Sequence, residues 1–303
     1  MSSTFSIANE TSTGRFERQT SRFRGWVSEP ESGRYHLYVC LACPWSHRAA
    51  LVRELKGLQD AIGISYAHPF RDERGWAFPG GAFADDVNGW SFLREGYLAT
   101  DPAFDGRVTV PVLWDKQEGV AVSNESQDIV RMLNSDFDAV AQRPELDLYP
   151  EGLRGEIDAL NERIYRDVND GVYRAGFATS QDAYEEAFTA LFARLGELEG
   201  LLGERRYLAG DRITEADWRL WVTLLRFDAV YYVHFRCNGR RLVDHPNLWA
   251  YARELYQQPG VEPTVAMDQI KEHYYTTHDM LNPKRLIPAG PLDMEWTEPH
   301  GRG

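Results

Sequence analysis

The chain has few cysteines and no long apolar run. Three of its 303 residues are cysteine (Cys40, Cys43 and Cys237), too few for the disulfide framework of a secreted domain. The longest apolar stretch, residues 220–235, is interrupted by an arginine and an aspartate, so no run of about 18 uncharged residues could span a bilayer. Met1–Ser6 lack the basic and apolar regions of a signal peptide. We therefore expect a soluble protein of a reducing cytoplasm.

Positive charge is also scarce. The chain has 33 lysines and arginines against 46 aspartates and glutamates, which gives a net charge of −13. Such an acidic chain is a poor general binder of nucleic acid or of anionic membranes, so we expect neither as a partner. The hydrophobic fraction of 43% in 303 residues is enough for a sizeable core, in two domains or in one large domain.

Cys43 stands where a predicted strand leads into a predicted helix. The apolar stretch Tyr35–Val39 precedes it, and Pro44–Leu55 has a helical pattern. The proline suits the first helical position, where its missing N–H costs nothing, and this makes Cys43 the N-cap residue. Its sulfur then faces the free N–H groups of Trp45 and Ser46 at the positive end of the helix dipole, which favours a thiolate over a thiol. The pattern predicts thiol chemistry.

The first half of the chain alternates between strand and helix signals. Strands are predicted at residues 35–39, 62–67, 108–114 and 119–122, and helices at residues 44–55 and 126–133. This order predicts a thioredoxin-like α/β domain over residues 31–140. The connection over residues 69–107 is too long to be an ordinary loop, and we predict that it is functional. Residues 1–30 precede the domain as an extended arm, whose arginines we expect to be solvated or paired within the chain: Arg15, Arg18, Arg22 and Arg24.

The second half of the chain has helical periodicity and no strand signal. Beyond Pro150 apolar residues recur at helical spacing. Thr214 and Asp217 form a capping-box pattern ahead of an aromatic helix over residues 218–235. We predict an all-helical domain over residues 150–285 and an irregular tail over residues 286–303. The fold class is therefore α+β, with a thioredoxin-like domain followed by an all-α helical bundle.

Two further segments suggest a peptide ligand near Cys43. Pro111 lies inside a strand pattern, which favours a loop with a cis peptide that leaves the backbone of Val110 open to an extended ligand. Glu125 and Ser126 open the next helix, where the helix N-terminus suits a carboxylate and Glu125 can receive an ammonium group. Glutathione, a short thiol peptide with a free α-amino acid end, has the required shape.

Six segments, in order, resemble the Xi-class glutathione transferases, the glutathionyl-hydroquinone reductases. They are Cys43-Pro44-Trp45, Arg71–Trp76, Arg107–Pro111, Asn124–Ser126, Gly171–Ala178 and His273–Tyr275. Other cysteine-type glutathione transferases share the first segment, so the ordered set carries the resemblance. It implies the glutathione transferase fold and a homodimer. It also implies the glutathione-dependent reduction of S-glutathionyl-hydroquinones to hydroquinones, with release of oxidised glutathione and without a metal or a nicotinamide.

The resemblance also implies roles for individual residues. Cys43 is the nucleophile and forms a mixed disulfide with glutathione. Tyr173 is the proton donor, Tyr231 and Tyr274 lie near the sulfur and tune its acidity, and the helical domain supplies a hydrophobic substrate site. Glutathione is held by Trp76, Arg107, Val108, Thr109, Val110, Pro111, Glu125 and Ser126.

Other interpretations of the cysteines are possible. Cys43 could be a buried structural residue, although its place before a proline at a helix start favours catalysis. Cys40 and Cys43 have C-x-x-C spacing, but the proline follows the second cysteine and Ser46 stands at the resolving position, so a dithiol couple is disfavoured. No second pair of residues has clean zinc-ligand spacing. His47 and Arg48 could add positive potential beside the sulfur.

The sequence does not decide which of two neighbouring tyrosines faces the sulfur, and it leaves the exact activity open. Tyr232 and Tyr275 compete with their neighbours Tyr231 and Tyr274 for a place at the sulfur. The cysteine–proline pair by itself would also fit an Omega-type thioltransferase or dehydroascorbate reductase. A non-catalytic scaffold of the same fold is a third hypothesis, and it predicts an unreactive Cys43.

Overall fold

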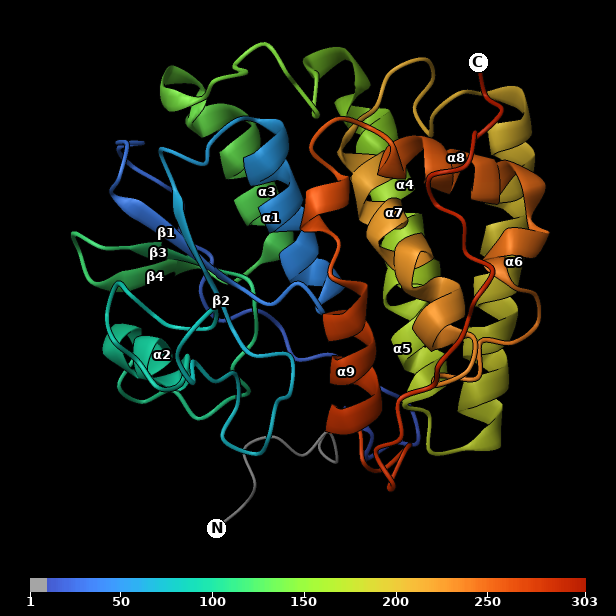
Figure 1. Ribbon diagram of the computed structural model, residues 1–303, viewed down its shortest axis with the longest axis horizontal. Helices are drawn as coiled ribbons and strands as arrows, with labels where there is room; N and C mark the ends of the chain where they lie inside the picture. The colour runs from blue at the N-terminus through green and yellow to red at the C-terminus, as the bar shows by residue number, and fades with distance from the viewer. Residues whose placement is uncertain (1–9) are drawn as a thin grey trace.

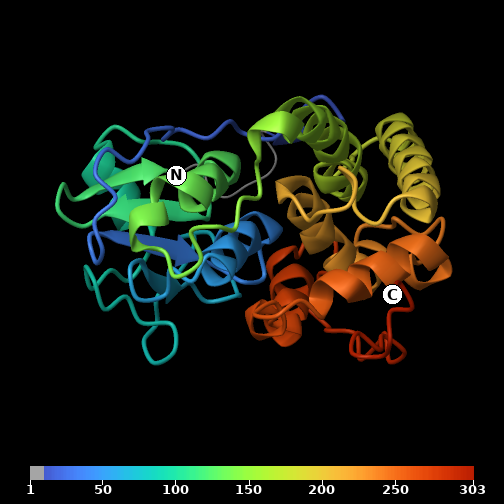
Figure 2. The same ribbon diagram turned by 90° about the horizontal axis from the view of Figure 1, so that it is seen from above.

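A sheet-containing half and a helical half lie side by side in the computed structural model, which describes residues 10–303 (Figures 1 and 2). The first nine residues of the predicted arm, and with them the Met1–Ser6 segment, lie outside the described residues. No helix within residues 10–303 is long and apolar enough to cross a membrane.

The sheet half contains four strands in the order β2-β1-β3-β4. Strand β1 pairs in parallel with β2 and antiparallel with β3, and β3 and β4 form an antiparallel pair. Helices α1 and α3 cover one face of the sheet and α2 lies on the other (Figure 1). This is the predicted thioredoxin-like arrangement, with β1 (Tyr35–Val39), α1 (Pro44–Leu55), β2 (Gly63–Tyr66), α2 (Arg94–Thr100), β3 (Val112–Asp115), β4 (Val120–Ser123) and α3 (Ser126–Arg131).

The strand predicted over residues 108–114 starts only at Val112. The peptide groups of Thr109 are not available to a sheet, because its N–H donates to the Tyr97 hydroxyl (3.1 Å) and its carbonyl accepts from that hydroxyl (2.8 Å). The peptide bond between Val110 and Pro111 is cis, as predicted. Residues 108–111 therefore form a loop that leads into the sheet.

The long connection over residues 69–107 has a structural role that the sequence interpretation missed. It contains α2 and buries a set of aromatic side chains against Tyr38 and Trp114, on the sheet face that α1 does not cover. Its length follows mainly from the need to cover that face. The connection thereby forms a second hydrophobic cluster, separate from the main core. Its buried residues include Trp76, Phe78, Leu93, Tyr97 and Phe104.

The second half is helical, and no strand follows Ser123 in the part of the chain that the structure describes, as predicted. The capping box of Thr214 and Asp217 is formed at the start of α7. The predicted helix 218–235 corresponds to the end of α7 and a π-helical turn over Phe227–Tyr231. The helices are α4 (Arg154–Ile164), α5 (Gly171–Gly176), α6 (Gln181–Glu204), α7 (Glu215–Arg226), α8 (Pro246–Tyr256) and α9 (Met267–Thr277).

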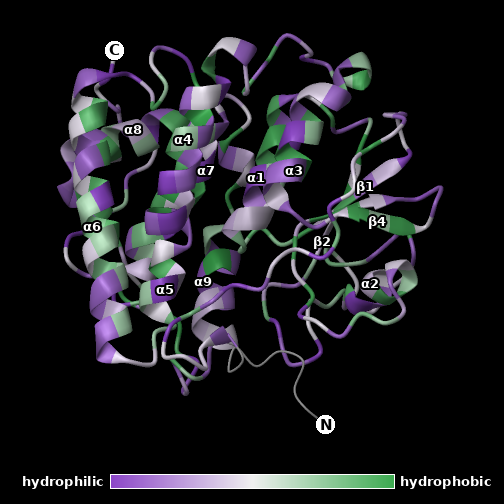
Figure 3. Ribbon diagram, turned by 180° about the vertical axis from the view of Figure 1, so that it is seen from behind, coloured by the Kyte–Doolittle hydropathy of each residue, from purple (hydrophilic) through white to green (hydrophobic). Residues whose placement is uncertain are grey.

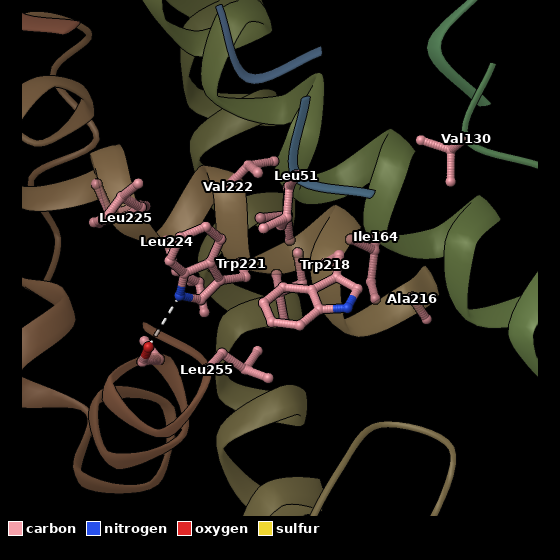
Figure 4. Packing of buried hydrophobic residues seen from close by; sticks show 14 of the residues in the cluster. Leu51, Val130, Ile164, Ala216, Trp218, Trp221, Val222, Leu224, Leu225 and Leu255 are labelled. Carbon is pink, nitrogen blue, oxygen red and sulfur yellow. Dashed lines mark hydrogen bonds between the residues drawn. The ribbon is translucent and has the colours of Figure 1, made fainter. Parts of the chain in front are cut away.

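Helix α7 lies at the centre of the core. Figure 4 shows Trp218 and Trp221 of α7 among aliphatic side chains that include Leu51 of α1 and Leu255 of α8. The buried indole nitrogen of Trp221 donates to the carbonyl of Ala252 (2.9 Å), so the ring carries no unpaired polar atom into the core. Helix α6 is amphipathic, with hydrophobic and hydrophilic residues in alternating patches along its length (Figure 3).

The arm runs over both halves, and the tail runs over the helical half. The arm pairs with β4, since the Gly25 N–H donates to the Val122 carbonyl (2.8 Å). In the predicted tail, residues 286–303 contain no helix or strand, and Trp296 packs against Trp249 with ring centroids 4.8 Å apart. The four arginines of the arm are all paired with carboxylates, which is one of the two outcomes expected: Arg15 with Glu186, Arg18 with Asp170, Arg22 with Asp101, and Arg24 with Asp128.

Candidate active site

Cys43 is the N-cap of α1, with a proline at the first helical position, as predicted. Its side chain makes no hydrogen bond to the helix, so the predicted contact with the N–H groups of Trp45 and Ser46 is not formed. The sulfur instead lies 3.7 Å from the carbonyl oxygen of Val110, in the loop before β3. The thiol is free and partly exposed. The helix start and the cis-proline loop therefore face each other across the sulfur.

The sulfur opens into a cleft between the two halves, with about 580 Å³ of empty volume. The sheet half supplies loop residues, and the helical half supplies residues of α5 and α9. The lining comprises Phe16, Arg18, Cys43, Trp45, Arg71, Trp76, Arg107, Thr109, Val110, Tyr173, Phe177, His273, Tyr274 and His278. A second hollow shares Arg18, Trp45, Arg107, Thr109 and Val110 with this cleft and adds Pro111, Glu125 and Ser126. The two hollows therefore adjoin each other along the loop before β3.

Ten of the twelve predicted site residues thus line one or both of these adjoining hollows, and two do not. Val108 is fully buried in the core under the sheet and does not reach the cleft. Tyr231 is also fully buried and lies behind the site, where its hydroxyl bonds to Tyr274 and its ring centroid is 6.0 Å from that of Tyr173. Val108 therefore lines neither hollow, and its predicted part in holding glutathione rests on the family resemblance alone.

Three tyrosine hydroxyls form a hydrogen-bonded series that ends in the cleft. The hydroxyl oxygens of Tyr173 and Tyr274 are 2.5 Å apart, and those of Tyr231 and Tyr274 are 3.0 Å apart. The neighbour Tyr275 instead donates its hydroxyl hydrogen to the Ala229 carbonyl (3.0 Å). Tyr275 therefore does not take the place of Tyr274 in this series.

The hydroxyls of Tyr173 and Tyr231 both bond to the hydroxyl of Tyr274. Either oxygen of each pair can donate, so the series can run with Tyr231 donating to Tyr274 and Tyr274 donating to Tyr173. In that arrangement the hydroxyl hydrogen of Tyr173 points to the cleft. Burial raises the pKa of Tyr173 well above its ordinary value, and the nearby Tyr231 and Cys43 raise it further, so Tyr173 holds its proton at neutral pH.

Three guanidinium groups surround the cleft. Arg18 donates to Asp170 (2.6 Å) and lies over the rings of Trp45 and Tyr173, with its carbon 4.9 and 4.7 Å from their centroids. Arg107 is 2.5 Å from the carboxylate of Glu10 in the arm. The side chain of Arg71 has no hydrogen bond or ion pair with any residue in the range 10–303. The positive field favours anionic ligands.

His47 does not provide the positive charge considered for it, whereas the Arg48 guanidinium lies near enough to Cys43 for the two groups to interact electrostatically. Burial lowers the pKa of His47 well below its ordinary value, and the neighbouring Arg226 lowers it further, so the ring is neutral. Arg48 is buried and donates to Asn169 (2.9 Å), away from the cleft lining. Cys40 is completely buried, and burial raises its pKa to about 12, which fits the interpretation of Cys40 as a core residue.

Glu125 caps the helix whose start it was predicted to mark. One carboxylate oxygen accepts from the N–H of Gln127 (3.1 Å) and the other from the hydroxyl of Ser21 in the arm (2.9 Å). Ionised carboxylates have further acceptor capacity, so Glu125 can still bind a donor in the second hollow. No group of three or more potential metal ligands occurs in the part of the chain that the structure describes.

Several cleft residues were missed as site residues. Arg18 was expected only as a paired or solvated arm residue, and Phe16 and Phe177 carry no local signal that distinguishes them from other core aromatics. His273 belongs to the last of the six segments that carry the family resemblance, next to Tyr274. Its ring stacks on the Trp76 ring, with centroids 5.2 Å apart. Only the folded chain brings these residues to one place.

Comparison with known proteins decides the family. Models of the N-terminal and the C-terminal glutathione S-transferase domains match residues 42–136 and 181–254. The chain is 47% identical over 305 residues to the glutathionyl-hydroquinone reductase YqjG of Escherichia coli, with 95% of this chain and 92% of that protein covered. It is 48% identical over 287 residues to the glutathionyl-hydroquinone reductase PcpF of Sphingobium chlorophenolicum, with 93% and 91% covered. The chain belongs to the glutathione transferase family.

Solved structures confirm the fold of this transferase and its resemblance to the Xi class. The glutathione-bound structure of YqjG superimposes with a TM-score of 0.89 at 47% identity, with 92% of this chain and 96% of that chain covered. The Xi glutathione transferase of Phanerochaete chrysosporium superimposes with a TM-score of 0.90 at 44% identity, with 93% and 95% covered.

Proposed function

We propose that this transferase is a glutathionyl-hydroquinone reductase. It uses glutathione to convert S-glutathionyl-hydroquinones to free hydroquinones and releases oxidised glutathione. One observation carries the proposal: Cys43 shares its cleft with the bonded pair Tyr173 and Tyr274, in a chain 47–48% identical to two proteins named for that reaction.

Glutathione extends from the sulfur along the loop before β3 to the start of α3. The cleft and the second hollow share the residues of that loop, which supports one continuous site for a tripeptide. Glu125 and Ser126 bind the α-amino acid end, and Val110 pairs through its backbone. Trp76 has a buried indole N–H without a partner in the described chain, which favours a hydrogen bond to a ligand carbonyl or carboxylate.

Arg107 binds a glutathione carboxylate only in competition with the arm. Its guanidinium is paired with Glu10, and the amide of Gln19 links the two segments by accepting from the Arg107 N–H (2.9 Å) and donating to its carbonyl (3.1 Å). A carboxylate of glutathione would share this cation with Glu10 or replace it.

The reaction begins with tautomerisation of the hydroquinone ring. A ring hydroxyl loses its proton while the carbon that carries sulfur gains a proton from Tyr173, so this carbon becomes tetrahedral and adjacent to a carbonyl. The Cys43 thiolate then attacks the glutathione sulfur. A sulfur–sulfur bond forms, the carbon–sulfur bond breaks, and its electron pair passes through the ring to the oxygen, which takes up a proton to give the hydroquinone.

A second glutathione completes the cycle. Its thiolate attacks the glutathione sulfur of the mixed disulfide, releases oxidised glutathione and regenerates the Cys43 thiolate. The ring is reduced by two electrons, and the two glutathione sulfurs are oxidised by two. The tyrosine series supports the first step, because Tyr274 and Tyr231 can replace the proton that Tyr173 gives up.

The direct test combines turnover with mass measurement. The purified protein, incubated with an S-glutathionyl-hydroquinone and glutathione, should release the free hydroquinone, and Cys43→Ala should not. Intact mass after treatment with oxidised glutathione should show one glutathione on Cys43. Full activity of Cys43→Ala, or no hydroquinone above the uncatalysed rate from the unmodified protein, would overturn the proposal.

An Omega-like thioltransferase is the second candidate. A Schizosaccharomyces pombe protein named glutathione S-transferase omega-like 2 is 40% identical over 307 residues, with 96% of this chain and 98% of that protein covered. This candidate predicts turnover of small mixed disulfides or dehydroascorbate much faster than hydroquinone release. The non-catalytic scaffold predicts neither reaction.

The remaining assignments follow the same reasoning. We propose a homodimer on the family resemblance, and a reducing cytoplasm because the three cysteines are free and glutathione is the co-substrate. The limits of the functional units are proposed at residues 31–140 and 150–285. Size-exclusion chromatography with light scattering tests the dimer, and limited proteolysis tests the limits.

A further inference from the structure

The cleft contains one cation that the described chain leaves unpaired. Arg71 lies in the loop after β2 and lines the cleft together with Cys43 and Tyr173. The other two cleft guanidinium groups, of Arg18 and Arg107, each contact a carboxylate at 2.6 and 2.5 Å. No carboxylate within residues 10–303 lies within ion-pair distance of Arg71. A cation left without an anion at the reacting centre is a candidate for binding one.

The surroundings hold Arg71 in place without neutralising it. Its backbone N–H donates to the hydroxyl of Thr277 in α9 (3.2 Å), which ties the loop to the helical half. Its guanidinium carbon lies 5.3 Å from the centroid of the Trp76 ring, and that ring stacks on His273. Burial lowers the pKa of Arg71, and Cys43 and the more distant carboxylate of Glu10 act in the opposite direction. The guanidinium is therefore prepared for an anion before any ligand arrives.

The proposed chemistry creates an anion that needs a hydrogen-bond donor beside the ring. When the carbon–sulfur bond breaks, its electron pair ends on a ring oxygen. The tyrosine series is committed to protonating carbon. His273 donates its Nδ1 hydrogen to the Pro69 carbonyl (2.7 Å), and burial lowers its pKa to about 3, so its other nitrogen carries no hydrogen to donate. Among the cleft guanidinium groups, that of Arg71 is the one without a carboxylate at ion-pair distance within residues 10–303, so we assign it as the donor.

We propose that the Arg71 guanidinium binds a ring oxygen of the hydroquinone and stabilises the negative charge that forms there as the carbon–sulfur bond breaks. This role rests on the proposed function. It makes Arg71 a catalytic residue and limits fast substrates to aromatic thioethers with a hydroxyl conjugated to the carbon that carries sulfur. The electron pair of that bond becomes the lone pair of the oxygen anion, which then accepts a proton, so no further reagent is required.

The first test compares two substrates on Arg71→Gln. For an S-glutathionyl-hydroquinone, kcat should fall about 100-fold, the usual loss for one donor to a developing oxygen anion, with little change in the KM for glutathione. The mixed disulfide of glutathione and 2-mercaptoethanol has no ring oxygen, and its turnover should stay close to that of the unmodified protein. Retained disulfide turnover also shows that the variant is folded.

The second test varies the acidity of the leaving oxygen. In a series of S-glutathionyl-hydroquinones with methyl, hydrogen or chlorine substituents, the rate should depend more steeply on hydroquinone pKa in Arg71→Gln, because the ring must then carry the charge unaided. Arg71→Lys should recover part of the lost rate, since it keeps the charge but not the forked donor. The control Arg74→Gln, in the same loop but exposed and paired with Asp72, should be unaffected.

The outcomes separate the inference from the proposed function. If the unmodified protein releases no hydroquinone, the proposed function fails, and this role for Arg71 fails with it. If the unmodified protein is active and Arg71→Gln loses both activities equally, Arg71 serves Cys43 or glutathione binding and the inference is wrong. Unchanged hydroquinone turnover or an unchanged substituent dependence in Arg71→Gln overturns it as well.

Discussion

The hydroxyl oxygens of Tyr173 and Tyr274 lie 2.5 Å apart, although 101 positions separate the two residues in the chain. One comes from α5 and the other from α9, so their pairing depends on how the helical half closes over the cleft. Tyr231 supports the pair from behind, at 3.0 Å from Tyr274. A proton can therefore move towards the cleft along a path that contains no titratable group other than tyrosine.

This geometry predicts a graded loss of activity along the series. Tyr173→Phe should lower kcat for hydroquinone release by about 100-fold or more, because a positioned acid contributes about 10²–10⁴-fold. Tyr274→Phe should cost less, since Tyr173 keeps its own proton, and Tyr231→Phe should cost least. Steady-state kinetics of the three variants checks the order. Tyr275→Phe, whose hydroxyl bonds to a backbone carbonyl, is the matched control. A larger effect for Tyr231→Phe than for Tyr173→Phe would contradict the role of Tyr173 as the proton donor.

Gly176 is required by the packing around Tyr173. A Cβ atom at this position would come 2.3 Å from Phe235, and the Phe235 ring lies 5.3 Å from that of Tyr173. Gly176→Ala should therefore destabilise the protein by about 1–3 kcal/mol and also reduce turnover. Gly171→Ala is the control in the same helix, because its Cβ would meet nothing closer than 3.6 Å. Urea denaturation of both variants measures the difference in stability. Equal midpoints would show that the Phe235 ring moves aside without destabilising the protein.

Lys56 fixes the segment between the two halves. Its amine is fully buried and donates to Asp138 (2.6 Å), to the Leu146 carbonyl (2.8 Å) and to the Pro144 carbonyl (3.3 Å). Lys56→Met keeps the length of the side chain but leaves these acceptors without their donor, which should cost about 2–3 kcal/mol. The urea midpoint of this variant is compared with that of the exposed Lys116→Met, which should stay within about 0.5 kcal/mol of the unmodified protein. If Lys56→Met loses no more stability than Lys116→Met, water has replaced the Lys56 amine as the donor to these acceptors.

Local rules predicted the sheet half well. A proline at the first helical position identified Cys43 as the N-cap residue, and a proline in a strand pattern identified the cis loop at Val110. Both inferences use a few neighbouring residues, and both features are present. The Cys43 sulfur makes no hydrogen bond to the helix N–H groups that it was predicted to face, and it lies near the carbonyl of the distant Val110.

The parts of the site that assemble from distant segments could not be read locally. Arg18 reaches the cleft because Asp170, 152 positions away, holds its side chain there. Arg71 is held by Thr277, 206 positions away. The sequence shows that both are arginines in polar segments, which is typical of a solvated surface. Their function depends on which carboxylates the fold places beside them.

The stability of the protein should fall as the pH drops from 7 to 5, because several histidines are buried in neutral form. Burial lowers the pKa of His36 and of His234 to about 4 and that of His273 to about 3, against an ordinary value of about 6.5. Below pH 6.5 the unfolded chain therefore binds protons that the folded chain does not, and the free energy of unfolding decreases until the folded pKa is reached. Burial raises the pKa of the carboxyls of Asp217 and Asp228, which act in the opposite direction at lower pH.

Each such histidine should contribute up to about 2 kcal/mol to this loss between pH 7 and pH 5. Urea midpoints at pH 7, 6 and 5 measure the slope for the unmodified protein. His234→Gln removes one of the titrating rings, which bonds to His278 (3.2 Å), so its slope should be shallower even if the variant is less stable at pH 7. A midpoint that stays constant or rises towards pH 5 would mean that these rings reach water in the folded state, since only then could they take up protons without unfolding.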